Sequence, residues 1–232
     1  MKGYGQFCPL AQATQVLCER WTLLIVRELL AGSSRFSEIQ KGVPLMSPTL
    51  LSTRLKQLTR AGIVELKGNK NNYSYLLTPA GMELRPIVEL MGAWGHRWVR
   101  SNLDQEDLDA SLLMWDMRRS VDPQTFCRPR VVVEFEYPDA PSGAQRWWLI
   151  SLENEADLCL DDPGYEVDVF VSCSLKTMTE IWICEKKFND AVKQGEIEVN
   201  GDPTLVKSFQ AWLCSSPLSR LGTVDELPDL NW

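Results

Sequence analysis

The sequence predicts an α+β protein with two domains, and three observations support this prediction. The chain has 232 residues. At about 150 residues per domain, this length lies between that of one large domain and that of two ordinary domains. Residues 1–100 contain 13 Lys and Arg against 6 Asp and Glu, while residues 101–232 contain 11 against 25, so the halves carry +7 and −14. Helical periodicity dominates the first half, and strand-like runs dominate the second. We expect domains at 1–100 and 101–232 with different partners.

Composition predicts a cytoplasmic protein. Hydrophobic residues make up 44% of the chain, as in globular proteins. No apolar run approaches the roughly 20 residues of a membrane-spanning helix, and the first residues lack a secretory segment with a cleavage site. The seven cysteines are scattered without a CxxC pair, and His96 is the one histidine. We therefore expect reduced thiols, no metal, no cofactor and no membrane partner.

The first half shows helical periodicity in four segments, followed by two strand-like runs and a long helix. The runs IVELKG and YSYLLT are joined by NKNN and predict a hairpin. The last helix follows Thr78, a suitable cap, and Pro86 either kinks or divides it. In chain order we expect helices at 9–17, 19–32, 34–43 and 48–60, strands at 63–68 and 73–78, and a helix at 79–99.

The fourth segment, SPTLLSTRLKQLTRAG, has the strongest helix signals. Ser47 suits the N-cap and Gly62 suits the residue just past the end. At about 100° per residue, Leu51, Leu55 and Leu58 lie on one side of the helix. The other side carries Thr49, Ser52, Thr53, Lys56 and Arg60.

This order of elements predicts a winged helix-turn-helix, a mostly α-helical domain with a β-hairpin wing. Such a domain places one helix in the major groove of double-stranded DNA, and its hairpin contacts the backbone or the minor groove. Lysines supply sequence-independent attraction, and short polar side chains approach bases and phosphates. A solvated helix without a DNA role remains the alternative, and Arg54 either contacts DNA or braces the helix. The candidate DNA-binding residues are Arg35, Ser37, Ser47, Thr49, Ser52, Thr53, Lys56, Arg60, Lys67, Lys70, Asn71 and Asn72.

The run from Cys8 to about Trp98 resembles the HxlR family of bacterial winged helix-turn-helix regulators. The matching pieces are CPLAQATQVL, ERWTLLIVREL, RFSEI, SPTLLSTRLKQLTRAGIVE and YLLTPAGMELRPIVELMGAWG. The resemblance implies a homodimeric transcriptional regulator with a roughly palindromic operator, whose first and last helices form the dimer interface. Those helices correspond here to residues 10–17 and 87–98. An apolar stripe on the second contains Ile87, Leu90, Met91, Trp94 and Trp98, and core packing is the alternative role for it.

Cys8 matches a cysteine that members of this family commonly carry before the proline, and in some members it senses oxidants or electrophiles. Sensing requires a thiolate with a lowered pKa and access to solvent. The resemblance therefore makes Cys8 a redox-sensing candidate. Cys18 is the one nearby cysteine that can be considered as its resolving partner, and an ordinary thiol is the alternative.

The second half is predicted to form an α+β domain after a helical junction near residues 107–121. Strand-like runs RVVVEFEY, QRWWLISLE, ADLCLDD and YEVDVFVS precede one or two helices, the strand EIEVNG and a final helix. The pieces DVFVSCSLKTMTEIW and AVKQGEIEVNGDPTLVKSFQAWL resemble the sterol-carrier-protein-like fold, which implies an apolar tunnel for a hydrophobic ligand. Core packing is the alternative role for its aromatic residues. The ligand-binding candidates are Trp115, Trp147, Trp148, Trp182, Phe188, Phe209 and Trp212.

No catalytic constellation is evident, because the acidic residues are spread through turns and strand edges without a carboxylate pair in an evident pocket. A G-x-S-x-G elbow and a phosphate-binding glycine loop are missing from the sequence. We expect a dimeric DNA-binding transcriptional regulator rather than an enzyme. An apolar effector in the second domain and oxidation of Cys8 are two possible routes of control. The alternative is a carrier of lipid-like ligands whose winged helix mediates protein–protein contact.

Overall fold

The chain divides into two compact units, residues 1–91 and 92–232. A computed structural model describes residues 4–69, 72–99, 103–104, 107–126, 128–153 and 155–222. The boundary between the units falls inside helix α6 (Arg85–Trp98), ahead of the seam expected at residue 101. Each unit is described by itself. None of the helices in these residues combines the length and apolar character needed to cross a membrane.

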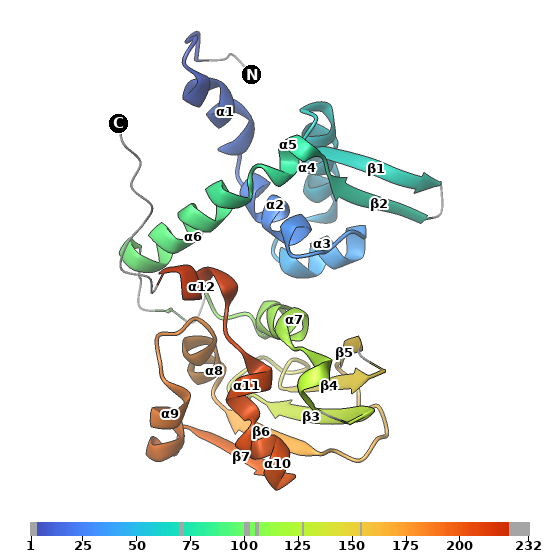
Figure 1. Cartoon of the computed structure of the whole chain (residues 1–232), viewed down its shortest axis with the longest axis vertical. Coiled ribbons are helices and arrows are strands. Elements are labelled where there is room, and N and C mark those ends of the chain that lie inside the picture. Colours follow the sequence, from blue (N-terminus) through green and yellow to red (C-terminus); the bar gives the residue numbers. More distant parts are fainter. Residues whose placement is uncertain are drawn as a thin grey trace. The chain divides into compact units, whose positions relative to one another are not determined.

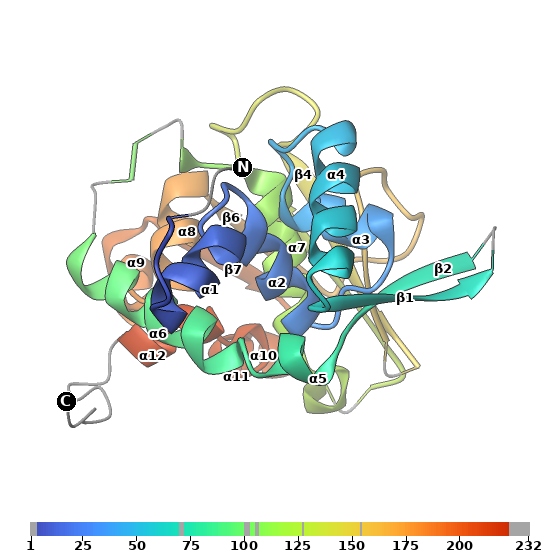
Figure 2. The same ribbon diagram turned by 90° about the horizontal axis from the view of Figure 1, so that it is seen from above.

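The first unit has the predicted order of helices and hairpin (Figure 1). The hairpin extends away from the helices in the views of Figures 1 and 2. Its elements before α6 are α1 (Pro9–Leu17), α2 (Thr22–Leu30), α3 (Phe36–Gly42), α4 (Pro48–Arg60), β1 (Val64–Asn69), β2 (Asn72–Leu77) and α5 (Pro79–Met82).

Two boundaries in this unit differ from the predicted ones. Helix α2 begins at Thr22 and not at residue 19, because Trp21 has a left-handed backbone with φ of 77° and L side chains rarely continue a helix in that conformation. The predicted long helix is divided, since α5 ends at Met82 and α6 begins at Arg85. Pro86 lies in the first turn of α6, where its missing N–H leaves no helical hydrogen bond unmade.

Helix α4 has the predicted caps and the predicted buried side. The Ser47 Oγ accepts a hydrogen bond from the Leu50 N–H at 3.3 Å, and Gly62 has φ of 72° just beyond the last turn. Leu51, Leu55 and Leu58 are almost fully buried in a core that α2 and α3 also supply. This burial fixes which side of the helix faces solvent.

An ion pair within α2, with a buried carboxylate, is also bonded to the end of α3. The Glu28 side chain is fully buried, and Arg27 donates to its Oε1 from Nη2 at 2.7 Å and from Nε at 3.0 Å. The same Nη2 donates to the Gly42 carbonyl at the end of α3, also at 2.7 Å. The Ser33 hydroxyl donates to Oε2 at 3.4 Å. These charge-assisted hydrogen bonds compensate the buried carboxylate for its lost hydration.

The second unit is built on a five-stranded sheet with strand order β5-β4-β3-β6-β7. Strands β3 and β6 are parallel, and the other neighbours are antiparallel. The strands are β3 (Arg130–Glu136), β4 (Arg146–Leu152), β5 (Glu155–Cys159), β6 (Val169–Cys173) and β7 (Ile197–Gly201). The described helices after α6 are α7 (Ala110–Ser120), α8 (Leu175–Trp182), α9 (Phe188–Gln194), α10 (Pro203–Lys207), α11 (Phe209–Leu213) and α12 (Pro217–Gly222), with a 3-10 turn at Pro123–Phe126.

The order of elements in this unit is the predicted one, and its closing helix differs. The strands precede the helix pair α8 and α9, and β7 follows them. The single final helix expected from PTLVKSFQAWLC is two short helices, α10 and α11, which meet at Ser208. The Ser208 hydroxyl donates to the Thr204 carbonyl at 3.0 Å and to the Leu205 carbonyl at 3.3 Å, a local bond that competes with continued helix.

Gly201 and Asp202 set the path of the chain from β7 into α10. A Cβ on Gly201 would lie 2.2 Å from the Asp168 carbonyl oxygen, and its φ is 132°, so only glycine fits the close approach of β7 to β6. Asp202 follows and caps α10 by accepting from Thr204 N at 2.9 Å and Leu205 N at 3.2 Å. A hydrogen bond from Arg128 holds the pKa of the Asp202 carboxyl below its usual value.

Alternate residues of the strands face opposite sides of the sheet. Val133, Phe135 and Leu149 lie in the main core with residues of the helices. Val132, Trp148 and Ile150 form a separate small cluster, and their alternation with the core residues places them on the other face. The second unit therefore has its main core on one side of the sheet.

We predict that Gly42→Ala destabilises the first unit. A Cβ at Gly42 would lie 1.9 Å from the Glu28 carboxyl carbon, so the carboxylate has to leave its buried position. Breaking a buried ion pair costs about 3 kcal/mol, and urea denaturation measures this loss. Gly95→Ala is the control, because nothing lies within 4 Å of a Cβ there and alanine is the better helix former. Equal stability of the Gly42 variant and the wild type would contradict the prediction.

Candidate nucleic-acid interface

Helix α4 presents its polar side to solvent because its leucines face the core. Lys56 and Arg60 are exposed and lie within 4.0 Å of no carboxylate in the part of the chain that is described. The Thr53 hydroxyl donates to the Thr49 carbonyl at 2.9 Å, which leaves its oxygen free to accept. Ser52 is half-buried, and Ser47 serves as the helix cap.

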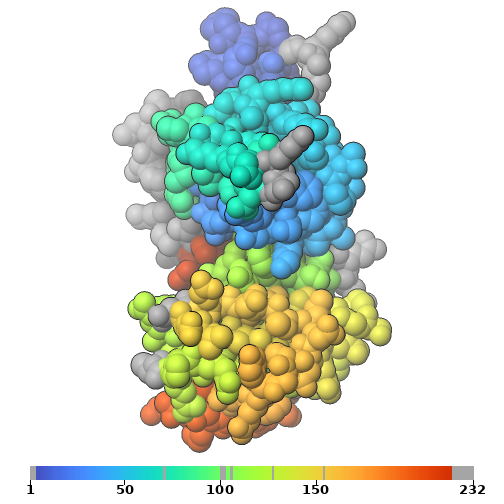
Figure 3. Space-filling view, turned by 90° about the vertical axis from the view of Figure 1, so that its right-hand side faces the viewer, coloured from blue at the N-terminus to red at the C-terminus, as the bar shows by residue number. Residues whose placement is uncertain are grey.

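The start of α3 adds Arg35 and Ser37 beside the hairpin. Arg35 Nη1 donates to the Tyr73 carbonyl of β2 at 3.1 Å, so this side chain ties α3 to the wing. The bond uses one of the five guanidinium N–H donors. Ser37 is exposed at the second position of α3. Figure 3 shows the wing strands in teal and the neighbouring blue segment on one face of this unit.

The wing carries a cation on β1 and an amide on β2. Lys67 is exposed and lies 2.8 Å from the Glu65 carboxylate, which neutralises part of its charge locally. Asn72 is exposed and pairs with Asn69 at the end of the hairpin ladder. The other two predicted wing residues, Lys70 and Asn71, lie outside the described residues.

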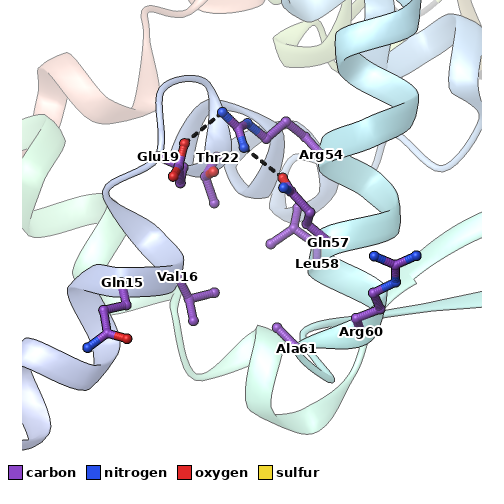
Figure 4. A pocket seen from close by; sticks show the side chains of 9 residues that line it. All are labelled: Gln15, Val16, Glu19, Thr22, Arg54, Gln57, Leu58, Arg60 and Ala61. Atoms are coloured by element: carbon purple, nitrogen blue, oxygen red, sulfur yellow. Dashed lines mark hydrogen bonds and ion pairs between the residues drawn. The ribbon is translucent and has the colours of Figure 1, made fainter. Parts of the chain in front are cut away.

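Arg54 braces α4 and does not point to the polar side (Figure 4). Its Nη2 lies 2.8 Å from Glu19 Oε2, and its Nε donates to the Arg20 carbonyl at 3.2 Å. Its Nη1 donates to Gln57 Oε1 at 2.6 Å. The structure thus decides between the two roles that the sequence left open. The partner Glu19 lies 35 residues away in the chain, and no local pattern indicates it.

Helices α1 and α6 carry exposed apolar side chains. Helix α1 has no buried residue, and Leu10 is exposed. In α6, Val88 enters the core, whereas Met91 and Trp94 are each 54% exposed. Ile87 and Trp98 are exposed as well, and Leu90 is half-buried. Core packing within the described chain therefore does not explain most of this stripe.

Cys8 is exposed immediately before α1, and Cys18 is exposed immediately after it. At 1.5 Å per residue, the helix separates the two by about 15 Å, while a disulfide needs Cα atoms within about 7 Å. While α1 is folded, Cys8 and Cys18 of the same chain are therefore too far apart to form a disulfide. Cys18 cannot act as the resolving partner in this conformation.

The structure separates the seven aromatic ligand-binding candidates into three groups. Trp147, Trp182, Phe209 and Trp212 belong to the main core of the second unit, and Phe188 packs against it. Phe209 lies 4.7 Å from Trp212 and 5.0 Å from Phe188 between ring centroids, so these rings fill space by packing on one another.

The remaining two aromatic candidates do not join that core. Trp148 lies on the other face of the sheet, because it follows Trp147 in a strand. Trp115 in α7 is buried with Arg118 at 5.0 Å and Arg119 at 5.8 Å from its ring centroid, a cation–π arrangement. The seven residues therefore do not line one cavity.

The fold and the exposed helix define the class of the first unit as a winged helix-turn-helix. Residues 16–103 match the family described as HxlR-like helix-turn-helix. The HTH-type transcriptional regulator YvaP of Bacillus subtilis (strain 168) is 38% identical over 99 residues, which are 41% of this chain and 92% of that protein. The chain therefore belongs to the HxlR-like helix-turn-helix family.

A second relative is the HTH-type transcriptional regulator YodB, also from Bacillus subtilis (strain 168). It is 35% identical over 95 residues, which are 39% of this chain and 85% of that protein. The crystal structure of quinone-bound YodB is 35% identical, covers 39% of this chain and all of that chain, and has a TM-score of 0.35. These relatives are transcriptional regulators and not enzymes, in agreement with the expectation from the sequence.

Proposed function

We propose that the chain is a homodimeric regulator that binds a roughly palindromic operator in double-stranded DNA through α4 and the wing. The observation that carries the proposal is the exposed polar side of α4, which buried leucines hold in a fixed orientation. Thr49, Ser52, Thr53 and Lys56 would contact the major groove, with Ser47 at its entry. Arg35, Ser37 and Arg60 would hold phosphates, and the wing contacts would come from Lys67, Lys70, Asn71 and Asn72.

The charges on this surface support a polyanionic partner. Lys56 and Arg60 have no carboxylate within 4.0 Å among the described residues, so their charge is available to phosphates. Arg35 retains four N–H donors beyond its bond to the wing. The alternative, a ligand carrier whose winged helix contacts another protein, predicts that α4 and the wing lack a continuous positive surface.

The apolar stripe on α6 and the exposed side of α1 support the homodimer. Leu10, Met91 and Trp94 expose apolar surface that a second copy would cover. A two-fold dimer would place two α4 helices about one DNA turn apart, which matches a palindromic site.

Two routes of control are proposed with the regulator. Binding of an apolar effector to a sterol-carrier-like second unit is supported by the order of strands, helix pair, β7 and closing helices. Because the core aromatic rings pack on one another, such a ligand would have to part them. Modification of Cys8 is supported by its exposure and by the quinone-bound form of the relative YodB.

We predict that Lys56→Ala weakens binding to an operator near the protein's own gene by about tenfold and lowers the salt slope by about one. The melting temperature should stay almost unchanged, because Lys56 is exposed. Fluorescence anisotropy over a salt series measures both quantities. Lys193→Ala, an exposed lysine on α9, is the matched control and should leave them unchanged. Absence of operator binding by the wild-type dimer at low salt would refute DNA recognition.

We predict that Met91→Glu converts the dimer to a monomer and weakens operator binding. A carboxylate in an apolar interface is left without compensation for its lost hydration. Light scattering coupled to size-exclusion chromatography reports the mass. Met82→Glu introduces the same charge at an exposed methionine of α5, outside the stripe, and should remain dimeric. If the Met91→Glu variant remained dimeric, α6 would not be part of the dimer interface.

We predict that benzoquinone weakens operator binding of the wild type and leaves Cys8→Ser unaffected. The Cys8 thiolate would add to a ring carbon of the quinone, which takes up the electron pair and a proton and becomes a hydroquinone thioether. Mass spectrometry of peptides identifies the modified cysteine, and Cys18→Ser is the control. Equal inhibition of wild type and Cys8→Ser would exclude Cys8 as the sensor.

A further inference from the structure

A pocket of about 280 Å³ lies in the first unit, on the inner side of α4 (Figure 4). Helix α1, the turn between α1 and α2, and the C-terminal half of α4 supply its walls. Its apolar surface comes from Val16, Leu58 and Ala61. The polar residues around it are Gln15, Glu19, Thr22, Arg54, Gln57 and Arg60.

The polar wall of this pocket is held in place by the Arg54 side chain, which is 14% exposed. Arg54 donates to Glu19 Oε2, the Arg20 carbonyl and Gln57 Oε1. These bonds use three of its five N–H donors, so two remain for another acceptor. Gln57 accepts through its oxygen, and its NH₂ group is left as a further donor. The orientation of these donors is therefore set before any ligand arrives.

Thr22 adds a hydroxyl to the same pocket. Its side chain belongs to a residue that is only 3% exposed, and Figure 4 shows it beside Glu19 and Arg54. No hydrogen bond joins its hydroxyl to another residue in the described part of the chain, although Thr22 lines the pocket. An acceptor bound in the pocket would give this hydroxyl a hydrogen-bond partner.

We propose that the pocket binds a compact organic carboxylate with an apolar body. Two arginines against one glutamate give the lining a net positive charge, and its unused donors exceed its acceptors. Arginine suits carboxylates because its planar fork of donors matches their geometry. A volume of about 280 Å³ lies just below the range of pockets that hold drug-sized ligands. The ligand should therefore be small, and benzoate is a suitable probe.

An occupant of this pocket touches α4 from behind its polar side, because Arg54, Gln57 and Leu58 all come from that helix. The carboxylate would change operator affinity to the extent that it binds the free and DNA-bound conformations differently. Binding itself goes beyond the proposed regulator and does not depend on it, so the test is carried out without DNA.

Isothermal titration calorimetry of the full chain with benzoate tests the site. We expect saturable binding of one benzoate per chain, and binding of the uncharged, equally shaped benzamide at least about tenfold weaker. Thr22→Val removes the hydroxyl at nearly constant volume and should weaken benzoate about tenfold. Arg60→Gln is an exposed change that tests the charge without risk to folding. Arg85→Gln, an exposed arginine outside the pocket, is the control.

Three results would overturn the proposal. The first is no saturable benzoate binding at tens of millimolar. The second is equal binding of benzoate and benzamide, or binding that neither the Thr22 nor the Arg60 variant weakens. The third is binding to the monomeric Met91→Glu variant but not to the wild type, because a second copy then covers the pocket. Failure of operator binding would leave all of these readouts intact, so the two proposals fail separately.

Discussion

The burial of three leucines on α4 is the constraint on which the first unit depends. Leu51, Leu55 and Leu58 recur at helical spacing and enter a core that α2 and α3 complete. Each buried leucine contributes about 2 kcal/mol by leaving water, and the three together fix the rotation of the helix about its axis. Because the rotation of α4 is fixed in this way, its polar side faces solvent. A rotated helix would expose leucine and bury Lys56, which has no buried partner there.

Arginine side chains then fix the helices relative to one another within this unit. Arg27 joins α2 to the end of α3 by donating to the Gly42 carbonyl, and Arg54 joins α4 to the turn before α2. Each guanidinium binds a carboxylate and a backbone carbonyl at the same time, which its planar array of donors permits and a lysine ammonium does not match. Apolar packing is non-directional, so these bonds add angular precision to the placement of the helices.

The second unit follows a different plan. Its sheet buries one face under helices and aromatic rings, while a smaller cluster around Trp148 lies on the other face. Residues 101–232, which make up most of this unit, carry −14, so DNA repels them and the basic first unit is the surface favoured for a nucleic acid. A ligand bound in either unit alters DNA binding only through a difference in affinity between two conformations, which is why direct binding and operator binding are separate measurements.

The sequence by itself determined the order of elements in both units, the caps of α4, its buried side and the family to which the first unit belongs. These features follow from local periodicity, from capping residues and from motifs that are contiguous in the chain. Trp147 and Trp148 are neighbours in a strand, so the sequence already placed them on opposite faces of the sheet. The prediction that both line one cavity did not take this into account.

Only the tertiary structure decided what depends on residues distant in the chain. Arg54 meets Glu19 across 35 positions, Arg27 reaches Gly42 across 15, and the pocket behind α4 draws on three separate segments. The same holds for the unburied stripe on α6, because a helix pattern shows which residues are apolar and not whether another element covers them. Local sequence specifies how each segment folds, whereas packing between segments specifies which polar groups meet and which surfaces stay open.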